Sequence, residues 1–291
     1  RLTITPGVRI EDYELTRADY DTADPTRALG PTRVRTLDDQ VVVPGIGVLY
    51  QATDDLTLLA GVHKGFAIAS PGNTSSDAEE SVNFEAGGRY SRGAFDVEAI
   101  AYFNDYSNLL GACTNSSGGN CVIGDQFDGG EVDVKGLELT AGWAAASVMN
   151  TDLSLPLPLV YTWTDAEFQE DFAGSYEPWG NVVAGDQLPY VPEHQLTLSA
   201  GVEAARWGAN LVANYVDEAR ARAGQGAIPA GERIDSRWVA DASVWYDVTE
   251  SIRLRAKAEN LFDEVYAASI DPAGLRPGKP QEILLGLELR F

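Results

Sequence analysis

The sequence is short of positive charge, and this shortage limits the partners it can have. Its 291 residues include 21 lysines and arginines against 44 aspartates and glutamates, which gives a formal net charge of -23 at pH 7. Proteins that bind nucleic acid neutralise phosphates with a surplus of lysine and arginine. The composition therefore excludes nucleic acid as the expected partner and indicates an acidic surface exposed to solvent.

Long apolar runs are also missing. No segment approaches the ~18 consecutive apolar residues expected of a membrane-spanning helix. The chain opens at Arg1 with neither an initiator methionine nor an apolar signal-type segment. A helical membrane protein is thereby excluded, and we expect Arg1 to be a processed or cut end.

Cysteine occurs only twice, at Cys113 and Cys121, on either side of the Gly/Ser/Asn-rich stretch 114–120. This arrangement predicts a local disulfide across a surface loop, and with it an oxidising compartment; two unpaired thiols are the alternative. No histidine or second cysteine pair lies near enough in sequence to complete a tetrahedral metal site. We expect no metal site here.

Histidine is equally scarce, with His63 and His194 alone. The Gly-x-Ser-x-Gly pattern of a nucleophile elbow is absent, and a Ser-His-Asp arrangement needs a spatial convergence that one sequence cannot show. We interpret both histidines as ordinary polar positions and expect that the protein is not an enzyme.

What the sequence does contain is alternation of apolar and polar residues with a period of two. In 281–291 the apolar side chains of Ile283, Leu285, Leu287, Leu289 and Phe291 share one face. Such segments predict about twelve antiparallel strands, longer than those of ordinary globular proteins. The expected spans are 2–15, 39–52, 56–66, 79–91, 94–106, 131–146, 153–165, 192–204, 207–219, 235–248, 251–261 and 281–291.

The connections between these strands alternate in length. Short turns at 53–55, 92–93, 148–152, 205–206 and 249–250 alternate with long polar loops at 16–38, 67–78, 107–130, 166–191, 220–234 and 262–280. This layout is typical of transmembrane β-barrels of the outer membrane, with turns in the periplasm and loops outside. Aromatic residues near strand ends fit the membrane interfaces. Pro156 and Pro158 lack amide donors toward the same neighbour, so we expect one ladder to be bulged or weakly paired.

Several motifs then resemble those of TonB-dependent receptors of the ferric-citrate type. The most specific is Asn260-Leu261-Phe262-Asp263, followed by Tyr266, which is similar to the family's penultimate-strand signature. Pro277 to Pro280 follows at the expected distance, and the final strand ends in Phe291, similar to the signal that the barrel assembly machinery recognises. Weaker matches extend over the rest of the chain.

The resemblance implies a fold and a mechanism. Receptors of this family close about 22 strands around a plug domain, so twelve strands would be the C-terminal part of such a barrel. Residues 1–291 are then expected to lack the plug and the N-terminal strands. The implied function is to bind a scarce extracellular nutrient, a ferric chelate or siderophore, for energy-coupled import. The chelate would be cargo, and no cofactor is expected.

The resemblance also implies location and partners. The chain would lie in the bacterial outer membrane among lipid and lipopolysaccharide, beside the missing plug and strands. The TonB complex would act through the absent N-terminal part.

Arginine is the residue that would hold an anionic chelate, since its planar fork matches carboxylates. The candidate ligand-binding residues are Arg33 and Arg35 in the first long loop, Arg220 and Arg222 in the fifth, Arg276 in the last, and Tyr176 and Trp179 in the fourth, with Arg17 and Arg27 as further donors. Surface ion pairs with nearby carboxylates are the alternative for each arginine. The fourth loop is acidic between 165 and 186, and its aromatic rings could instead stack on a neutral or cationic organic chelate.

Two other classes of protein fit part of this pattern of strands and loops. One is a self-closed twelve-stranded outer-membrane pore or enzyme, and the other is a soluble acidic β-sandwich that acts as a binding module. An isolated half-barrel in lipid is excluded, because each unpaired backbone group in hydrocarbon costs several kcal/mol.

Overall fold

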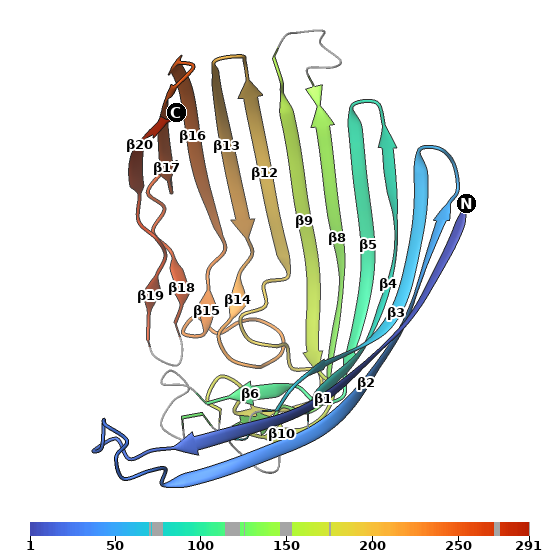
Figure 1. The fold of residues 1–291 in the computed structure, drawn as a ribbon, viewed down its shortest axis with the longest axis vertical. Helices are drawn as coiled ribbons and strands as arrows, with labels where there is room; N and C mark the ends of the chain where they lie inside the picture. The colour runs from blue at the N-terminus through green and yellow to red at the C-terminus, as the bar shows by residue number, and fades with distance from the viewer. Residues whose placement is uncertain are drawn as a thin grey trace.

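A computed structural model describes residues 1–69, 71, 78–113, 123–124, 126–145, 153–174, 176–270 and 274–290. One antiparallel sheet of twelve strands dominates it (Figure 1). In order across the sheet these are β1 (Leu2–Asp19), β2 (Arg33–Gln51), β3 (Leu56–Ala67), β4 (Glu79–Arg92), β5 (Phe95–Tyr106), β8 (Val132–Ala144), β9 (Pro156–Phe168), β12 (His194–Glu203), β13 (Trp207–Val216), β16 (Arg237–Thr249), β17 (Ile252–Glu259) and β20 (Glu282–Leu289). All twelve strands predicted from alternation are confirmed.

The boundaries of the first long loop were wrong. The first two strands continue to Asp19 and from Arg33, so the loop predicted at 16–38 is only 20–32. Polar pairs across the two strands hold the extension together: Tyr13 donates to Asp39 at 3.1 Å, and the hydroxyls of Thr16 and Thr36 lie 3.3 Å apart. Both faces of this segment are polar, so alternation does not reveal it as strand. The extended hairpin bends across the long-loop end of the sheet (Figure 1).

The long loops contain structure that the sequence did not predict. Each of four two-stranded sheets lies within one loop: β6 (Leu110–Ala112) with β7 (Gln126–Asp128), β10 (Phe172–Ala173) with β11 (Asn181–Val182), β14 (Ala219–Arg220) with β15 (Arg233–Ile234), and β18 (Ala267–Ser269) with β19 (Arg276–Pro277). A small apolar core of Val132, Phe168 and Val182 joins the ends of β8 and β9 to the loop that follows. The loops are thus anchored to the sheet.

The register places apolar side chains on one face of the sheet. One continuous row of paired residues runs through Ile4, Val48, Ala60, Ala86, Ala101, Leu137 and Trp163. At the other edge Leu254 pairs with Leu287, and Ala256 with Leu285. Large apolar side chains on this face are exposed, with Leu285 83% accessible. A broad exposed apolar face of this kind fits contact with lipid and leaves the opposite, polar face to line an interior.

Among the described residues, no helix is long and apolar enough to cross a membrane.

The two prolines weaken one ladder, as predicted. Pairing of β8 with β9 continues through Pro158 and Pro156, but pairing of β9 with β12 stops at Leu159 and Leu198. Beyond that point the described strands meet again only at an isolated bridge between Ser154 and Glu203. Successive amides of a strand point to alternate sides, so two prolines spaced by two remove donors from the same side. The result is a short, proline-limited seam between β9 and β12.

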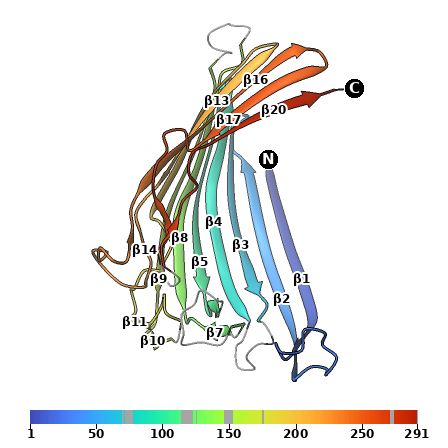
Figure 2. The same cartoon turned by 90° about the vertical axis from the view of Figure 1, so that its left-hand side faces the viewer.

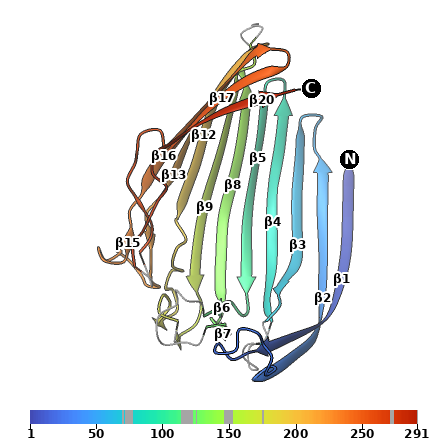
Figure 3. The ribbon, with the colours of Figure 1, turned by 60° about the vertical axis from the view of Figure 1, so that its left-hand side comes forward.

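The sheet is open. Its edge strands are β1 and β20, which do not pair with each other in the described structure. The wall curves strongly, and both ends of the chain lie toward the short-turn end (Figures 2 and 3). In a bilayer both edges require further strands, because hydrocarbon offers no hydrogen-bond partners.

Candidate functional site

The first hairpin brings several predicted arginines to the long-loop end, on strands rather than in a loop. Arg17 donates through Nε to Asp19 at 2.7 Å and through Nη1 to the carbonyl of Gly124 at 2.6 Å. Arg35 donates to the other carboxylate oxygen of Asp19 at 2.9 Å, and Arg33 is exposed at the start of β2. The hairpin therefore contacts the third long loop, and Asp19 holds two of its arginines.

Arg220 is the most enclosed of the predicted ligand-binding residues, with an exposure of 3%. Its Nε donates to Gln187 Oε1 at 3.1 Å and its Nη2 to the carbonyl of Gly226 at 2.9 Å. Burial lowers the pKa of the Arg220 guanidinium. Its donors bind the loops themselves, so its main role is to hold the fourth and fifth loops together.

The structure brings three predicted residues from two different loops close together: Tyr176 and Trp179 of the fourth loop and Arg222 of the fifth. Arg222 donates to Glu177 at 2.6 Å. Trp179 packs edge-to-face on Tyr176, with ring centroids 5.3 Å apart, and on Phe168, at 5.6 Å. Burial raises the pKa of Tyr176. The aromatic cluster supports the loop from inside, which leaves Trp179 little free surface for stacking on a ligand.

A cavity of about 360 Å³ opens where β9 and β12 diverge, next to the fifth loop. Five carboxylates and Arg220 are among the side chains that line it: Asp165, Glu167, Glu193, Asp217 and Glu218. Four of these carboxylates have partners in the described structure: Asp165 pairs with Lys135 at 3.0 Å, Glu193 accepts from Trp163 at 3.1 Å, Asp217 accepts from Tyr215 at 2.9 Å, and Glu218 lies 3.8 Å from Arg233. This cavity is acidic and does not suit an anionic chelate.

The remaining predicted residues are Arg276, Phe291 and the two cysteines. Arg276 is exposed on β19, which pairs with β18 in the last long loop. Phe291 and Cys121 lie outside the described residues. Cys113 is 3% exposed and has no free thiol.

The Cys113–Cys121 disulfide stays a prediction with a direct test. A bridge that closes about nine residues should stabilise the folded third loop by about 2–3 kcal/mol, because it restricts the unfolded chain. The sheet itself should form without it. Mass spectrometry of unreduced peptides is expected to find the two cysteines joined. Recovery of two alkylatable thiols from freshly isolated protein would contradict the assignment.

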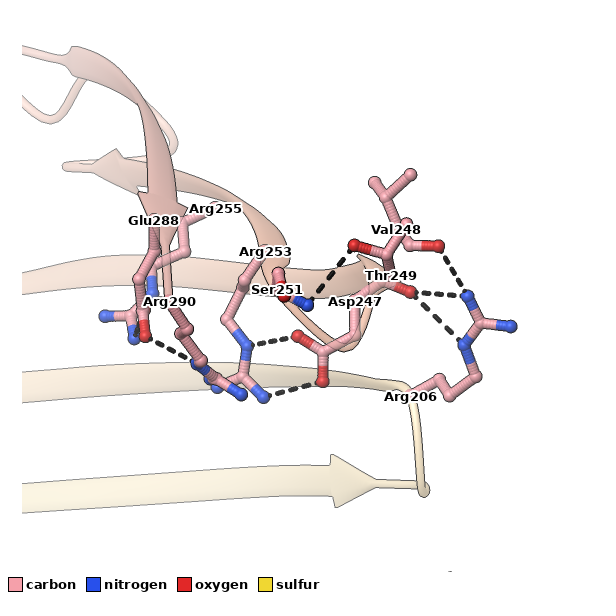
Figure 4. Close-up of polar contacts among 9 residues, drawn as sticks. All are labelled: Arg206, Asp247, Val248, Thr249, Ser251, Arg253, Arg255, Glu288 and Arg290. Carbon is pink, nitrogen blue, oxygen red and sulfur yellow. Dashed lines mark hydrogen bonds and ion pairs between the residues drawn. The ribbon is translucent and has the colours of Figure 1, made fainter.

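A polar network at the short-turn end was missed by sequence reasoning (Figure 4). Arg253 donates through Nε and Nη2 to both carboxylate oxygens of Asp247, at 2.6 and 2.8 Å, and its guanidinium lies 3.9 Å from the ring centroid of Trp245. Arg255 and Arg290 both bind Glu288. The charged side chains on β16, β17 and β20 lie on the face opposite the apolar row, and only the cross-strand register decides which of them pair. The network joins β16, β17 and β20.

Known proteins share this sequence pattern. A family model described as TonB dependent receptor-like, beta-barrel, matches residues 1–261. The chain is 28% identical over 303 residues to the metal-pseudopaline receptor CntO of Pseudomonas aeruginosa, which covers 98% of this chain and 38% of CntO. It is 35% identical over 118 residues to the catecholate siderophore receptor Fiu of Escherichia coli, which covers 38% of this chain and 15% of Fiu. The chain thus spans well under half the length of these relatives.

Solved structures share the fold. The unliganded ferric citrate transporter FecA superposes with a TM-score of 0.72 at 22% identity, over 100% of this chain and 43% of FecA. The siderophore receptor PiuA from Acinetobacter baumannii gives a TM-score of 0.75 at 16% identity, over 99% of this chain and 40% of PiuA. With the family match, the open wall and its one apolar face, these likenesses lead to one conclusion. The chain belongs to the TonB-dependent receptor β-barrel family, whose members lie in the bacterial outer membrane, and it forms twelve antiparallel strands of such a barrel.

Proposed function

We propose that residues 1–291 are the C-terminal part of the barrel of a receptor that imports a metal chelate, specifically a ferric chelate or siderophore. The observation that supports this most is the asymmetry of the two ends of the sheet. At one end the fourth and fifth loops bind each other, through Arg222 and Glu177 and through Gln187 N and Gly224 O at 2.9 Å. Short turns close the strands at the other end. A structured entrance above a polar interior suits capture of a solute from outside.

Import requires parts beyond this chain. The proposed partners are the missing N-terminal strands and plug, and the TonB complex that supplies energy. Relatives of this chain are named as receptors for metal-pseudopaline and for catecholate siderophores, which supports a chelated metal as cargo. The residues of this chain would bind and orient the chelate without covalent chemistry.

Growth on a single chelate tests the proposal. The natural full-length protein, expressed in a strain without its own chelate receptors, is expected to restore growth on at least one of ferric citrate, a ferric hydroxamate or a ferric catecholate. The effect should vanish when TonB is deleted. Restored growth that does not need TonB would indicate a passive pore instead, and no growth on any chelate would contradict the proposed import.

The arginines of the first hairpin provide the ligand prediction. Replacing Arg33 and Arg35 together with glutamine is expected to weaken binding of ferric citrate by about 1.5–3 kcal/mol for each lost charge-assisted contact. Binding to the purified full-length receptor, measured by calorimetry, gives the change. The matched control is Arg233→Gln, since Arg233 is an exposed loop arginine that pairs with Asp235 at 2.8 Å. Equal losses in both variants would mean that these arginines are only surface ion-pair partners.

A further inference from the structure

The interior face of three adjacent strands contains a row of polar side chains that no step of the proposed function has used. The register aligns His63 of β3 with Asn83 of β4, and Asn83 with Asn104 of β5. We call these three residues the lumen row. They line a cavity of about 360 Å³ near the long-loop end of the strands.

The centre of the lumen row is fixed in place. Asn83 is 9% exposed, and its Nδ2 donates to Ser81 Oγ at 3.1 Å and to the carbonyl of His63 at 3.4 Å. Gly65 makes room for this arrangement, because a Cβ there would lie 2.6 Å from Ser81 Oγ and 2.9 Å from Asn83 Nδ2. With Nδ2 committed in this way, the amide has its oxygen left as an acceptor. No hydrogen bond among the described residues reaches that Oδ1.

The charged side chains that line this cavity are acidic. Glu79 and Glu85 line the same cavity, and the described lining contains neither lysine nor arginine. Glu79 accepts a hydrogen bond from the amide of Leu110 at 2.9 Å, whereas Glu85 has no ion pair or hydrogen bond within the described part of the chain. A carboxylate without a cation, next to a fixed amide oxygen, attracts a group that is both positively charged and rich in donors.

The neighbouring wall leaves space for the rest of such a ligand. Gly45 lies opposite His63 on one side, and Gly7 lies opposite Gly45. A Cβ at Gly7 or Gly47 would meet nothing within 4 Å, and a cavity of about 680 Å³ lies over these glycines and is also lined by His63 and Glu85. Three cations line this cavity too, and each pairs with a glutamate other than Glu85: Arg9 with Glu11, Lys64 with Glu80 and Arg89 with Glu98. The two cavities together can hold a ligand larger than a single amine.

We propose that the lumen row and Glu85 bind a protonated amine of the imported chelate. The ammonium would donate to Glu85 and to Asn83 Oδ1. This inference rests on the proposed function and deepens it, because it adds an amine to the chemistry of the cargo.

Two chelates that differ only in the amine provide the test. The ferric complex of desferrioxamine B ends in an ammonium, and its N-acetylated form does not. The full-length receptor is expected to bind the ammonium form about tenfold more tightly, as one charge-assisted contact would give. Glu85→Gln should remove most of that difference. Glu138→Gln, which changes an exposed carboxylate on β8, should preserve it.

The outcomes separate this inference from the import function. Equal affinities for the two chelates, binding of neither, or an unchanged preference in Glu85→Gln would overturn the amine site. If TonB-dependent growth on a chelate persists in those cases, import stands without the amine site. Protection of His63 from diethyl pyrocarbonate in the ligand-free receptor would show that polypeptide already covers the row, and would also overturn the proposal.

Discussion

Replacing Leu285 with arginine is expected to lower the free energy of unfolding in a bilayer by about 2–4 kcal/mol, the cost of a cation near the middle of a barrel's lipid face. Leu285 lies midway along β20, pairs with Ala256 and is largely exposed on the apolar face. Leu254→Arg on the adjacent strand should behave in the same way. Urea unfolding of the full-length protein in lipid vesicles gives the values.

The opposite face provides the control. Arg255→Ala removes an ion pair with Glu288 in which both side chains are partly exposed. Ion pairs of this kind contribute about 0–1 kcal/mol, so this variant should be far milder than Leu285→Arg. If Leu285→Arg and Arg255→Ala destabilised the protein equally, the two faces of the sheet would have the same surroundings, which would contradict the prediction.

Asn260→Ala is expected to destabilise the protein by about 3–4 kcal/mol, because it removes three hydrogen bonds that a buried side chain makes to the backbone. Asn260 is 2% exposed, and its Nδ2 donates to the carbonyls of Glu264 and Lys279 at 2.8 and 2.9 Å. Its Oδ1 accepts from the amide of Glu264 at 2.8 Å. With a φ of 48°, the residue also adopts a left-handed conformation that asparagine tolerates better than alanine.

The same unfolding assay distinguishes the contacts of Asn260. Asn260→Asp retains the acceptor for the Glu264 amide and loses both donors, so it should fall between the wild type and alanine. Phe262→Ala, at a 77% exposed position of the same turn, should change stability much less. If Asn260→Ala were no worse than Phe262→Ala, the signature motif would not hold the last long loop to the end of β17.

Alternation predicted the twelve strands because one face of the sheet meets an apolar environment and the other face meets a polar one. Leu254 and Arg255 are adjacent in sequence but face opposite sides of the wall, so one is apolar and the other is charged. The pattern disappears where both faces meet water. That is why the ends of the first hairpin, around Asp19 and Arg33, and the short strands of the long loops were not found.

The candidate site was harder to predict, since pairing depends on register and loop folding. Arginine positions suggested ligand contacts, yet Arg220 is buried between loops and Arg222 pairs with Glu177. The lumen row is visible only once β3, β4 and β5 are aligned, because Asn83 and Asn104 lie far apart in the chain. His63 looked like an ordinary polar position for the same reason.

The proline-limited seam has a mechanical consequence. On the β12 side, β9 is joined through five residue pairs, His194–Leu198 with Trp163–Leu159, whereas on its other side it is paired along its whole length with β8. Resistance to bending between two strands comes largely from the hydrogen bonds that join them, so we expect the wall to bend more readily along this line than between β8 and β9. We therefore expect a load on one rim to bend the wall along this seam, and the acidic cavity opens at the outer end of the seam.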